Sequence, residues 1–222
     1  VLRFSLPLAA TGVLQLLFNA ADVIVVGKFA GATALAAVGA TTALINLLGN
    51  VSDVSAMTKK SFEKRLITSQ PHNGEIIDVD VNTYIAGTMR FESGAIGTLF
   101  TTFDVYYPEQ ARVEVYGSEG TLYVPDPNGF GGPIRPGEGM REMPLEFDNY
   151  AENSRALGLA DMAKALQTGR KFRCNCGQTY HVLEIMEGFT KSGDERREVK
   201  IESRFEKSPI MRNDLECGVL ED

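Results

Sequence analysis

The most constraining feature of the sequence is an alternation of side-chain character over residues 77–91. Mostly apolar residues occupy every second position from Ile77 to Phe91, and Asp78, Asp80 and Arg90 are among the residues between them. A period of two over this length predicts one long strand with a core face and a polar face. Glu92-Ser93-Gly94 has the composition of a turn, and residues 95–105 are again strand-like, so residues 77–105 are a predicted hairpin.

Other segments have patterns that complete an α+β fold. Strand patterns begin at residues 51–57, return at 111–116 and 121–124, and end at 198–202. Two amphipathic helices are predicted between them, ending at Gly169 and near Gly193. Their apolar stripes are Leu159, Met162, Ala163 and Leu166 in the first helix, and Val182, Ile185, Met186 and Phe189 in the second. We therefore predict an open, mostly antiparallel sheet with both helices on one face.

Charge divides the 222 residues into two unequal parts. Residues 1–50 carry a net charge of +1, from Arg3, Lys28 and Asp22, whereas the whole chain carries −7. The acidic remainder has no clustered basic patch, which argues against nucleic-acid binding. Three cysteines, Cys174, Cys176 and Cys217, indicate neither a disulfide framework nor a zinc site, and we predict no metal site.

The N-terminal part is apolar enough to suggest a membrane. Residues 6–26 are about as long as a bilayer-spanning helix, roughly 20 residues, although Gln15, Asn19 and Asp22 interrupt them. A second apolar run, residues 30–48, is rich in Ala and Gly. We therefore expect an N-terminal hydrophobic helical segment, residues 1–48, with membrane association possible through residues 6–48.

The words FNAADVIVVGKFAGATALAAVG, residues 18–39, resemble the first membrane helix and following loop of MATE-family multidrug efflux transporters, and this resemblance covers residues 1–48. The resemblance implies that Asp22 stands where that family places an acidic residue for cation coupling. A position near the membrane interface is the alternative for Asp22. One helix and part of a second cannot form a transport path, because such paths lie between packed bundles.

A second and more specific resemblance covers residues 43–209. It rests on the words VSAMTKKSFEKRLITSQPHNGEIIDVDV, FESGAIGTLFTTFDV, VEVYGSEGTLYVPDPN, YAENSRALGLADMAKAL and YHVLEIMEGF. These words resemble the C-terminal domain of Gfo/Idh/MocA oxidoreductases. The resemblance implies a parent activity of hydride transfer between NAD or NADP and a sugar, polyol or related small molecule. It also implies a domain that closes over the substrate and forms an oligomer with its open sheet face.

Several parts of such an enzyme are not found in the sequence. We identify no strand, GxGxxG and helix unit for NAD(P), and no lysine stands in the Glu-Lys-Pro motif of the family. The resemblance places a further catalytic element of the family just before Ala43, but the residues there have transporter-like sequence. We therefore predict no catalytic or cofactor-binding residues and no cofactor in this chain.

Four residues are candidates for substrate binding. Asn153 and Arg155 could hold a polyol or an acidic group by hydrogen bonds, with a helix cap and a surface charge as the alternative. His181, beside Tyr180 at the start of the second helix, could act as an acid or base. The alternative for His181 is a hydrogen-bonding residue of the core or helix surface.

The domain prediction is a hydrophobic segment at 1–48, an oxidoreductase-like domain at 49–209 and a polar tail at 210–222. The functional hypothesis is a truncated oxidoreductase domain in a chimeric chain, inactive alone, that binds substrate and forms a homo-oligomer through its open sheet face. The alternatives are a membrane-tethered interaction module and a transporter fragment. Residues 49–222 are expected in the cytoplasm, and the chain at a membrane if its N-terminal segment inserts.

Overall fold

The computed structural model of the chain describes residues 41, 44–68, 70–102, 104, 113–124, 134–137, 157–173 and 175–209. Residues 44–48 are helical and lead into the first strand. The elements are β1 (Val51–Lys59), β2 (Lys64–Leu66), β3 (Ile76–Asp78), β4 (Tyr84–Phe91), β5 (Ile96–Thr102), β6 (Val113–Gly117), β7 (Gly120–Val124), β8 (Arg135–Pro136), α3 (Leu157–Thr168), α4 (Cys176–Glu195) and β9 (Val199–Lys200).

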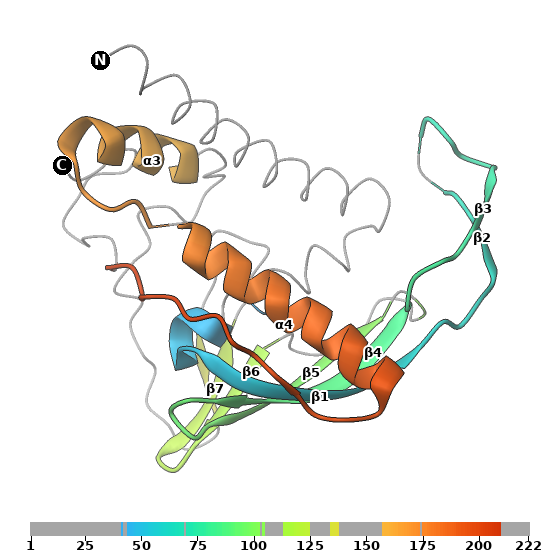
Figure 1. Cartoon of the computed structure of the whole chain (residues 1–222), viewed down its shortest axis with the longest axis horizontal. Coiled ribbons are helices and arrows are strands. Elements are labelled where there is room, and N and C mark those ends of the chain that lie inside the picture. The colour runs from blue at the N-terminus through green and yellow to red at the C-terminus, as the bar shows by residue number, and fades with distance from the viewer. Residues whose placement is uncertain are drawn as a thin grey trace.

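The central element is a four-stranded antiparallel sheet of order β5-β4-β1-β9 (Figure 1). β4 pairs with β1 from Lys59↔Tyr84 to Val51↔Phe91, with one irregularity between Val51 and Asp53. Because neighbouring residues of a strand point to opposite faces, Val54, Met89 and Phe91 enter the core, whereas Met57 and Thr88 lie on the other face. The predicted α+β class and antiparallel sheet are confirmed.

Helix α4 covers the core face of this sheet (Figure 1). Its residues Val182, Ile185 and Phe189 are buried, as the predicted stripe required, whereas Met186 is exposed. Two glycines allow the helix to approach the strands closely: a Cβ on Gly188 would lie 3.0 Å from Val54 Cγ2, and one on Gly87 would lie 2.7 Å from Phe189 Cε1. The main core cluster is Ile45, Val51, Val54, Met89, Phe91, Val182, Ile185, Phe189, Val199, Ile201 and Phe205.

Residues 201–209, which we call the strap, run back over this core without regular secondary structure. The Asn50 side chain pairs with the backbone of Phe205, accepting from its N–H at 3.0 Å and donating to its carbonyl at 3.2 Å. The Glu184 carboxylate accepts from the N–H groups of Glu202 and Ser203 at 2.9 and 2.8 Å. Side-chain hydrogen bonds therefore satisfy backbone groups of the strap that no strand pairs.

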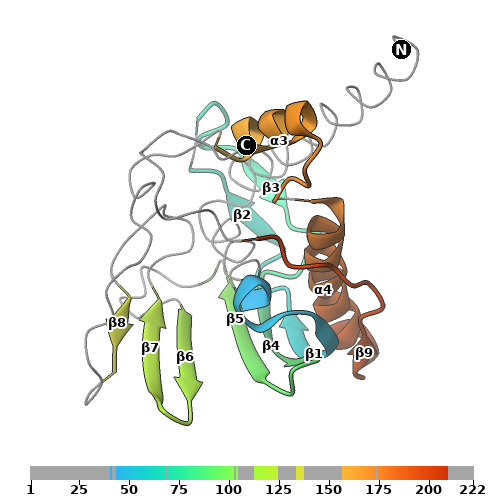
Figure 2. The same cartoon turned by 90° about the vertical axis from the view of Figure 1, so that its left-hand side faces the viewer.

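Helix α3 lies beyond the end of the sheet and not on its face, which differs from the predicted arrangement (Figures 1 and 2). Its buried residues are Asp161, Met162 and Ala165, whereas Leu159 and Leu166 of the predicted stripe are exposed. The buried Asp161 carboxylate accepts hydrogen bonds from the guanidinium groups of Arg170 and Arg173, at 2.7 and 2.5 Å. Satisfying this carboxylate orients α3 against the segment that leads to α4. Gly169 ends the helix as predicted, at φ +77°.

The predicted long strand over 77–91 is wrong, because the structure divides it. β3 pairs with β2 in a separate two-stranded hairpin, which projects from the body of the molecule (Figure 1). The chain turns at Thr83, whose N–H donates to the Lys59 carbonyl at 3.0 Å. β4 therefore starts only at Tyr84. The predicted pair over 111–124 is present as β6 and β7, which form a third sheet with β8.

Some predictions fall outside the described residues. These are the two apolar segments up to residue 40, Asp22 among them, the polar tail 210–222, and Cys174 and Cys217. Among the residues that the structure describes, no helix has the length and apolar character needed to cross a bilayer. The described ranges likewise contain no group of three or more metal-ligating side chains. The division of the chain at residues 48 and 209 stays a prediction.

The close approach of α4 to the sheet predicts the effect of adding one methyl group. Gly87→Ala is expected to destabilise the fold by about 1–3 kcal/mol, because the new Cβ meets the Ser55 carbonyl at 2.6 Å as well as the Phe189 ring. Gly158→Ala in α3 is the matched control, since its Cβ would meet nothing within 4 Å. Urea denaturation of both variants measures the difference, and equal midpoints would contradict this account of the packing.

Candidate functional site

The structure separates the two described candidates for substrate binding. Tyr180 is 61% exposed on α4, whereas His181, the next residue of the helix, is fully buried. Successive residues of a helix point about 100° apart, so one faces solvent and the other faces the sheet. The other two candidates, Asn153 and Arg155, lie outside the described residues. Substrate binding by these four residues stays a prediction.

His181 joins three segments of the fold. Its Nε2 accepts a hydrogen bond from the Val51 N–H at the start of β1, at 3.0 Å. Its Nδ1 lies 2.9 Å from the Ser203 hydroxyl of the strap. The Phe205 ring lies against the imidazole with a centroid separation of 5.4 Å. The environment of His181 is therefore that of a core hydrogen-bonding residue, the alternative given by the sequence.

The protonation of His181 follows from these contacts. Burial lowers its pKa below the ordinary value, and the nearby Arg204 charge acts in the same direction, outweighing the opposite effects of Glu184, Ser203 and Glu92. Because a backbone N–H always donates, Nε2 must carry a lone pair, and the ring proton of the neutral imidazole lies on Nδ1. Both ring nitrogens are thus engaged within the fold.

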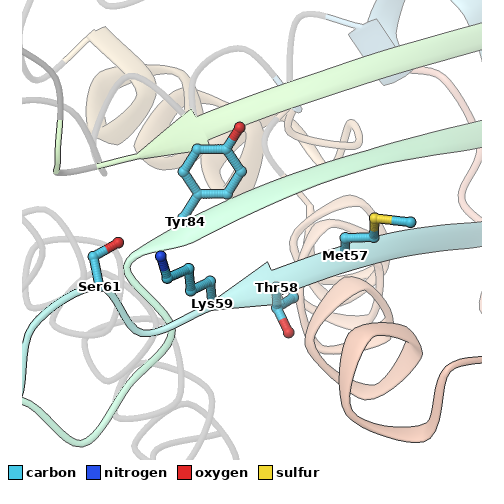
Figure 3. Close-up of a pocket in the computed structure, with 5 residues that line it drawn as sticks. All are labelled: Met57, Thr58, Lys59, Ser61 and Tyr84. Atoms are coloured by element: carbon cyan, nitrogen blue, oxygen red, sulfur yellow. The ribbon is translucent and has the colours of Figure 1, made fainter.

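A cavity of about 400 Å³ lies where β1 ends (Figure 3). Its lining residues come from β1, the segment after it and the start of β4: Met57, Thr58, Lys59, Ser61 and Tyr84. These side chains offer an amine, three hydroxyl groups and a thioether, and none of them is a carboxylate. The cavity could hold a small ligand that accepts hydrogen bonds, but its described lining residues include no acid–base pair.

A polar network adjoins this cavity at Ser61. Thr83 is buried, and its hydroxyl accepts from the Ser61 N–H at 3.0 Å and donates to Asp104 Oδ2 at 3.0 Å. Arg65 of β2 donates to Asp104 Oδ1 at 2.9 Å. Partial burial raises the pKa of Asp104, but hydrogen bonds from Ser61 and Thr83 and the Arg65 charge outweigh it, so the pKa lies below its ordinary value. The network fixes the projecting hairpin to the sheet.

Sequence reasoning did not find this network. Asp104 lies in a predicted strand, Thr83 in a predicted long strand and Arg65 in an unassigned segment, and the alternation of residues gives no sign that the three meet. Chain separations of 39 residues between Arg65 and Asp104 and 21 between Thr83 and Asp104 explain the omission. A threonine among the mostly apolar positions of the alternating pattern is the one signal that the sequence offers.

The described residues do not fit the pyrophosphate of a dinucleotide. Such a site needs free N–H groups at a helix start that follows a parallel strand and a glycine-rich turn. At the start of α4 the Asn175 side chain accepts from the Gln178 N–H at 3.0 Å, so one amide of the first turn is engaged by the cap. The sheets that the structure describes pair antiparallel throughout.

Comparison with known families gives a match to part of the chain. Residues 31–123 match the model of the GFO/IDH/MocA C-terminal domain. The match includes β1 to β6 and most of β7, with the cavity and its supporting network. It begins within the segment 1–48, so part of the second apolar run also belongs to it. No curated protein matches the chain.

Solved structures with a similar fold are oxidoreductases. An oxidoreductase from Thermotoga maritima superimposes with a TM-score of 0.53 at 18% identity, over 77% of this chain and 44% of that protein. An NAD binding oxidoreductase from Klebsiella pneumoniae gives 0.51 at 16% identity, over 74% and 49%. A levoglucosan dehydrogenase in complex with NADH and L-sorbose gives 0.50 at 19% identity, over 73% and 50%. At these identities the likeness shows the fold alone.

The chain spans about half the length of these solved proteins, or less. The family match supports the oxidoreductase resemblance seen in the sequence over residues 31–123. The comparisons give no support to the transporter resemblance of residues 1–48 or to a chimeric chain. Cation coupling by Asp22 therefore has no finding in its favour.

The Asp104 network predicts a stability difference that depends on pH. Asp104→Asn is expected to cost about 1–3 kcal/mol of unfolding free energy at pH 7, because it removes a charged acceptor from Arg65. A carboxylate whose pKa is depressed in the folded protein stabilises the fold at pH values above its unfolded pKa. This stabilisation is lost as the pH falls through the pKa of the folded state. The difference from the parent protein should therefore shrink below about pH 4.

Asp78→Asn is the matched control for urea denaturation at pH 7 and pH 3. Its pair with Lys64 is largely exposed, so its removal should change the stability by less than about 0.5 kcal/mol. If Asp104→Asn is no more destabilising than Asp78→Asn at pH 7, the network does not hold the hairpin.

Proposed function

We propose that the described unit is the substrate-side domain of an NAD(P)-dependent oxidoreductase that acts on a sugar, a polyol or a related small molecule. The match of residues 31–123 to the GFO/IDH/MocA C-terminal domain carries the proposal. The sheet with α4 on one face, and its likeness to oxidoreductases of known structure, supports the same assignment at the level of the fold. A fold alone does not specify a reaction, so the substrate class rests on the family match.

In this proposal the unit positions a substrate and supplies no hydride carrier. Hydride transfer requires a nicotinamide held beside the substrate, and the described residues contain no glycine-rich turn between a parallel strand and a helix that would hold its pyrophosphate. The contribution of the unit is then the cavity at the end of β1, where Lys59, Ser61 and Tyr84 donate to hydroxyl or carboxylate oxygens. We accordingly infer that the chain alone is inactive.

This inference predicts the outcome of a turnover assay. The purified chain mixed with NAD or NADP and a panel of aldoses and polyols should give no increase in absorbance at the nicotinamide wavelength above a blank without protein. A denatured sample of the same preparation is the control for contaminating dehydrogenase. Turnover that follows the chain through two chromatographic steps would overturn the inference that it is inactive alone.

We further propose that the open face of the sheet is a contact between copies of the chain. Met57, Ile96 and Phe100 project from it with 81%, 70% and 56% of their surfaces exposed, although β1, β4 and β5 are otherwise well paired. Tyr84 and Phe100 stack edge to face on the same side, with ring centroids 5.2 Å apart. An apolar surface on the face opposite α4 is typical of an interface between subunits.

Self-association through this face predicts a single-residue effect. Phe100→Lys should lower the fraction of dimer or higher oligomer at least tenfold in light scattering or sedimentation, because a charge is expensive to bury at an interface centre. Leu183→Lys is the matched control: Leu183 is 53% exposed, but it lies on α4, on the other side of the sheet. A monomeric parent protein, or equal losses in both variants, would contradict the proposed interface.

A further inference from the structure

We propose that the strap, residues 201–209, is a pH-gated element, and that the buried imidazole of His181 latches it to the start of β1 and to α4. The proposal rests on the contacts of the described residues and does not depend on the proposed enzymatic function. It concerns a conformational step within the fold, in which the strap is closed at neutral pH and opens under mildly acidic conditions.

The latch works only with a neutral ring. Val51 N–H donates to Nε2, so the ring proton on Nδ1 must be the one donated to the Ser203 hydroxyl. A second proton would go to Nε2 and would place two donors, the ring N–H and the Val51 N–H, against each other at 3.0 Å. Since the site is buried, water cannot accept either proton in place. Protonation therefore requires the groups around His181 to separate.

The strap is held by fewer backbone ladder bonds than the sheet, although its Ile201 and Phe205 side chains are buried in the core. β1 is held along its length by a ladder of hydrogen bonds to β4, and it pairs with β9 at Asp53 and Val54. The strap follows β9, and its Ile201 N–H donates to the Ser52 carbonyl. The other hydrogen bonds of the strap have a side chain as donor or acceptor, as do those of the Phe205 N–H with Asn50 and of Ser208 with the Arg173 carbonyl. Segments with few ladder bonds open at lower free energy than the sheet.

Charged groups from three elements face His181. Glu184 lies one turn further along α4, Glu92 comes from the turn between β4 and β5, and Arg204 belongs to the strap itself. Arg204 pairs with Glu92, which joins the strap to that turn. The two carboxylates favour a charged imidazole, whereas burial and the Arg204 charge oppose it more strongly, and the pKa of His181 is lowered. The strap is thus closed at neutral pH.

The direction of the pH effect follows from linkage. A histidine whose pKa is depressed in the folded protein stabilises the closed form at pH values above its unfolded pKa, about 6.5. This stability is lost as the pH falls below about 6.5. The equilibrium constant for opening of the strap should increase by up to about tenfold for each unit by which the pH is lowered in this range. Glu184 also contacts the strap, but its pKa is lowered from 4.5, so it is still charged between pH 6.5 and 5.

The chain offers a clean experiment, because it contains only two histidines. His72 lies exposed at the tip of the projecting hairpin beside Glu75, so His72→Gln should leave the fold intact and His181 as the single imidazole. Amide hydrogen exchange of the full chain is measured from pH 7 to pH 5 in this variant and corrected for the intrinsic rate at each pH. Protection of the Ser203 and Phe205 amides should fall by up to about tenfold per pH unit, whereas amides of the β4–β5 ladder should keep theirs.

The same exchange measurement in His72→Gln/His181→Gln should show no dependence on pH in this range. If that double variant does not fold, the titration of the His181 Cε1–H resonance in His72→Gln decides, and an apparent pKa below 6.5 is expected. An apparent pKa of 6.5 or above would overturn the proposal. Strap protection that is equal at pH 7 and pH 5, or an equal loss across the whole sheet, would overturn it as well.

Discussion

The close packing of α4 on strands β1 and β4 is the interaction on which the rest of the described structure depends. It requires two positions without a side chain, Gly87 on the sheet and Gly188 on the helix, because a methyl group on either would come within 3.0 Å of a neighbouring atom. At that separation Phe189 and Ile185 are fully covered by the strands. The helix then places His181 within hydrogen-bond distance of the backbone of β1, which a longer separation would not permit.

This arrangement determines how the two faces of the sheet differ. On the covered face, apolar packing and the His181 and Glu184 contacts hold the helix, the strap and the first strand together. On the open face, the apolar side chains of Met57 and Phe100 are exposed, because no described helix covers this face. The cavity at the end of β1 lies between these environments, where the chain leaves the sheet for the projecting hairpin.

Sequence periodicity predicted the elements whose environment repeats along the chain. The stripe of Val182, Ile185 and Phe189 is visible in sequence because a helix returns to the same face every three or four residues. The division of residues 77–91 is not visible, because β3 and β4 continue one alternating pattern and the break depends on Thr83 meeting Lys59 and Asp104. The strap has no period at all, and its pairing of Asn50 with Phe205 joins residues 155 positions apart.

The sequence predicts that His181 can titrate, but it does not predict where His181 lies in the fold. Residue type alone shows that His181 can titrate near neutral pH, whereas its role depends on which atoms its two nitrogens meet. The structure supplies a fixed donor, the Val51 N–H, on one side and a hydroxyl, which can donate or accept, on the other. The fixed donor admits only the neutral ring, while the hydroxyl tolerates either state. The sensitivity to protonation therefore comes from the backbone of β1. A side chain without a titratable nitrogen that still accepted from the Val51 N–H and bonded to Ser203 would hold the strap without responding to pH.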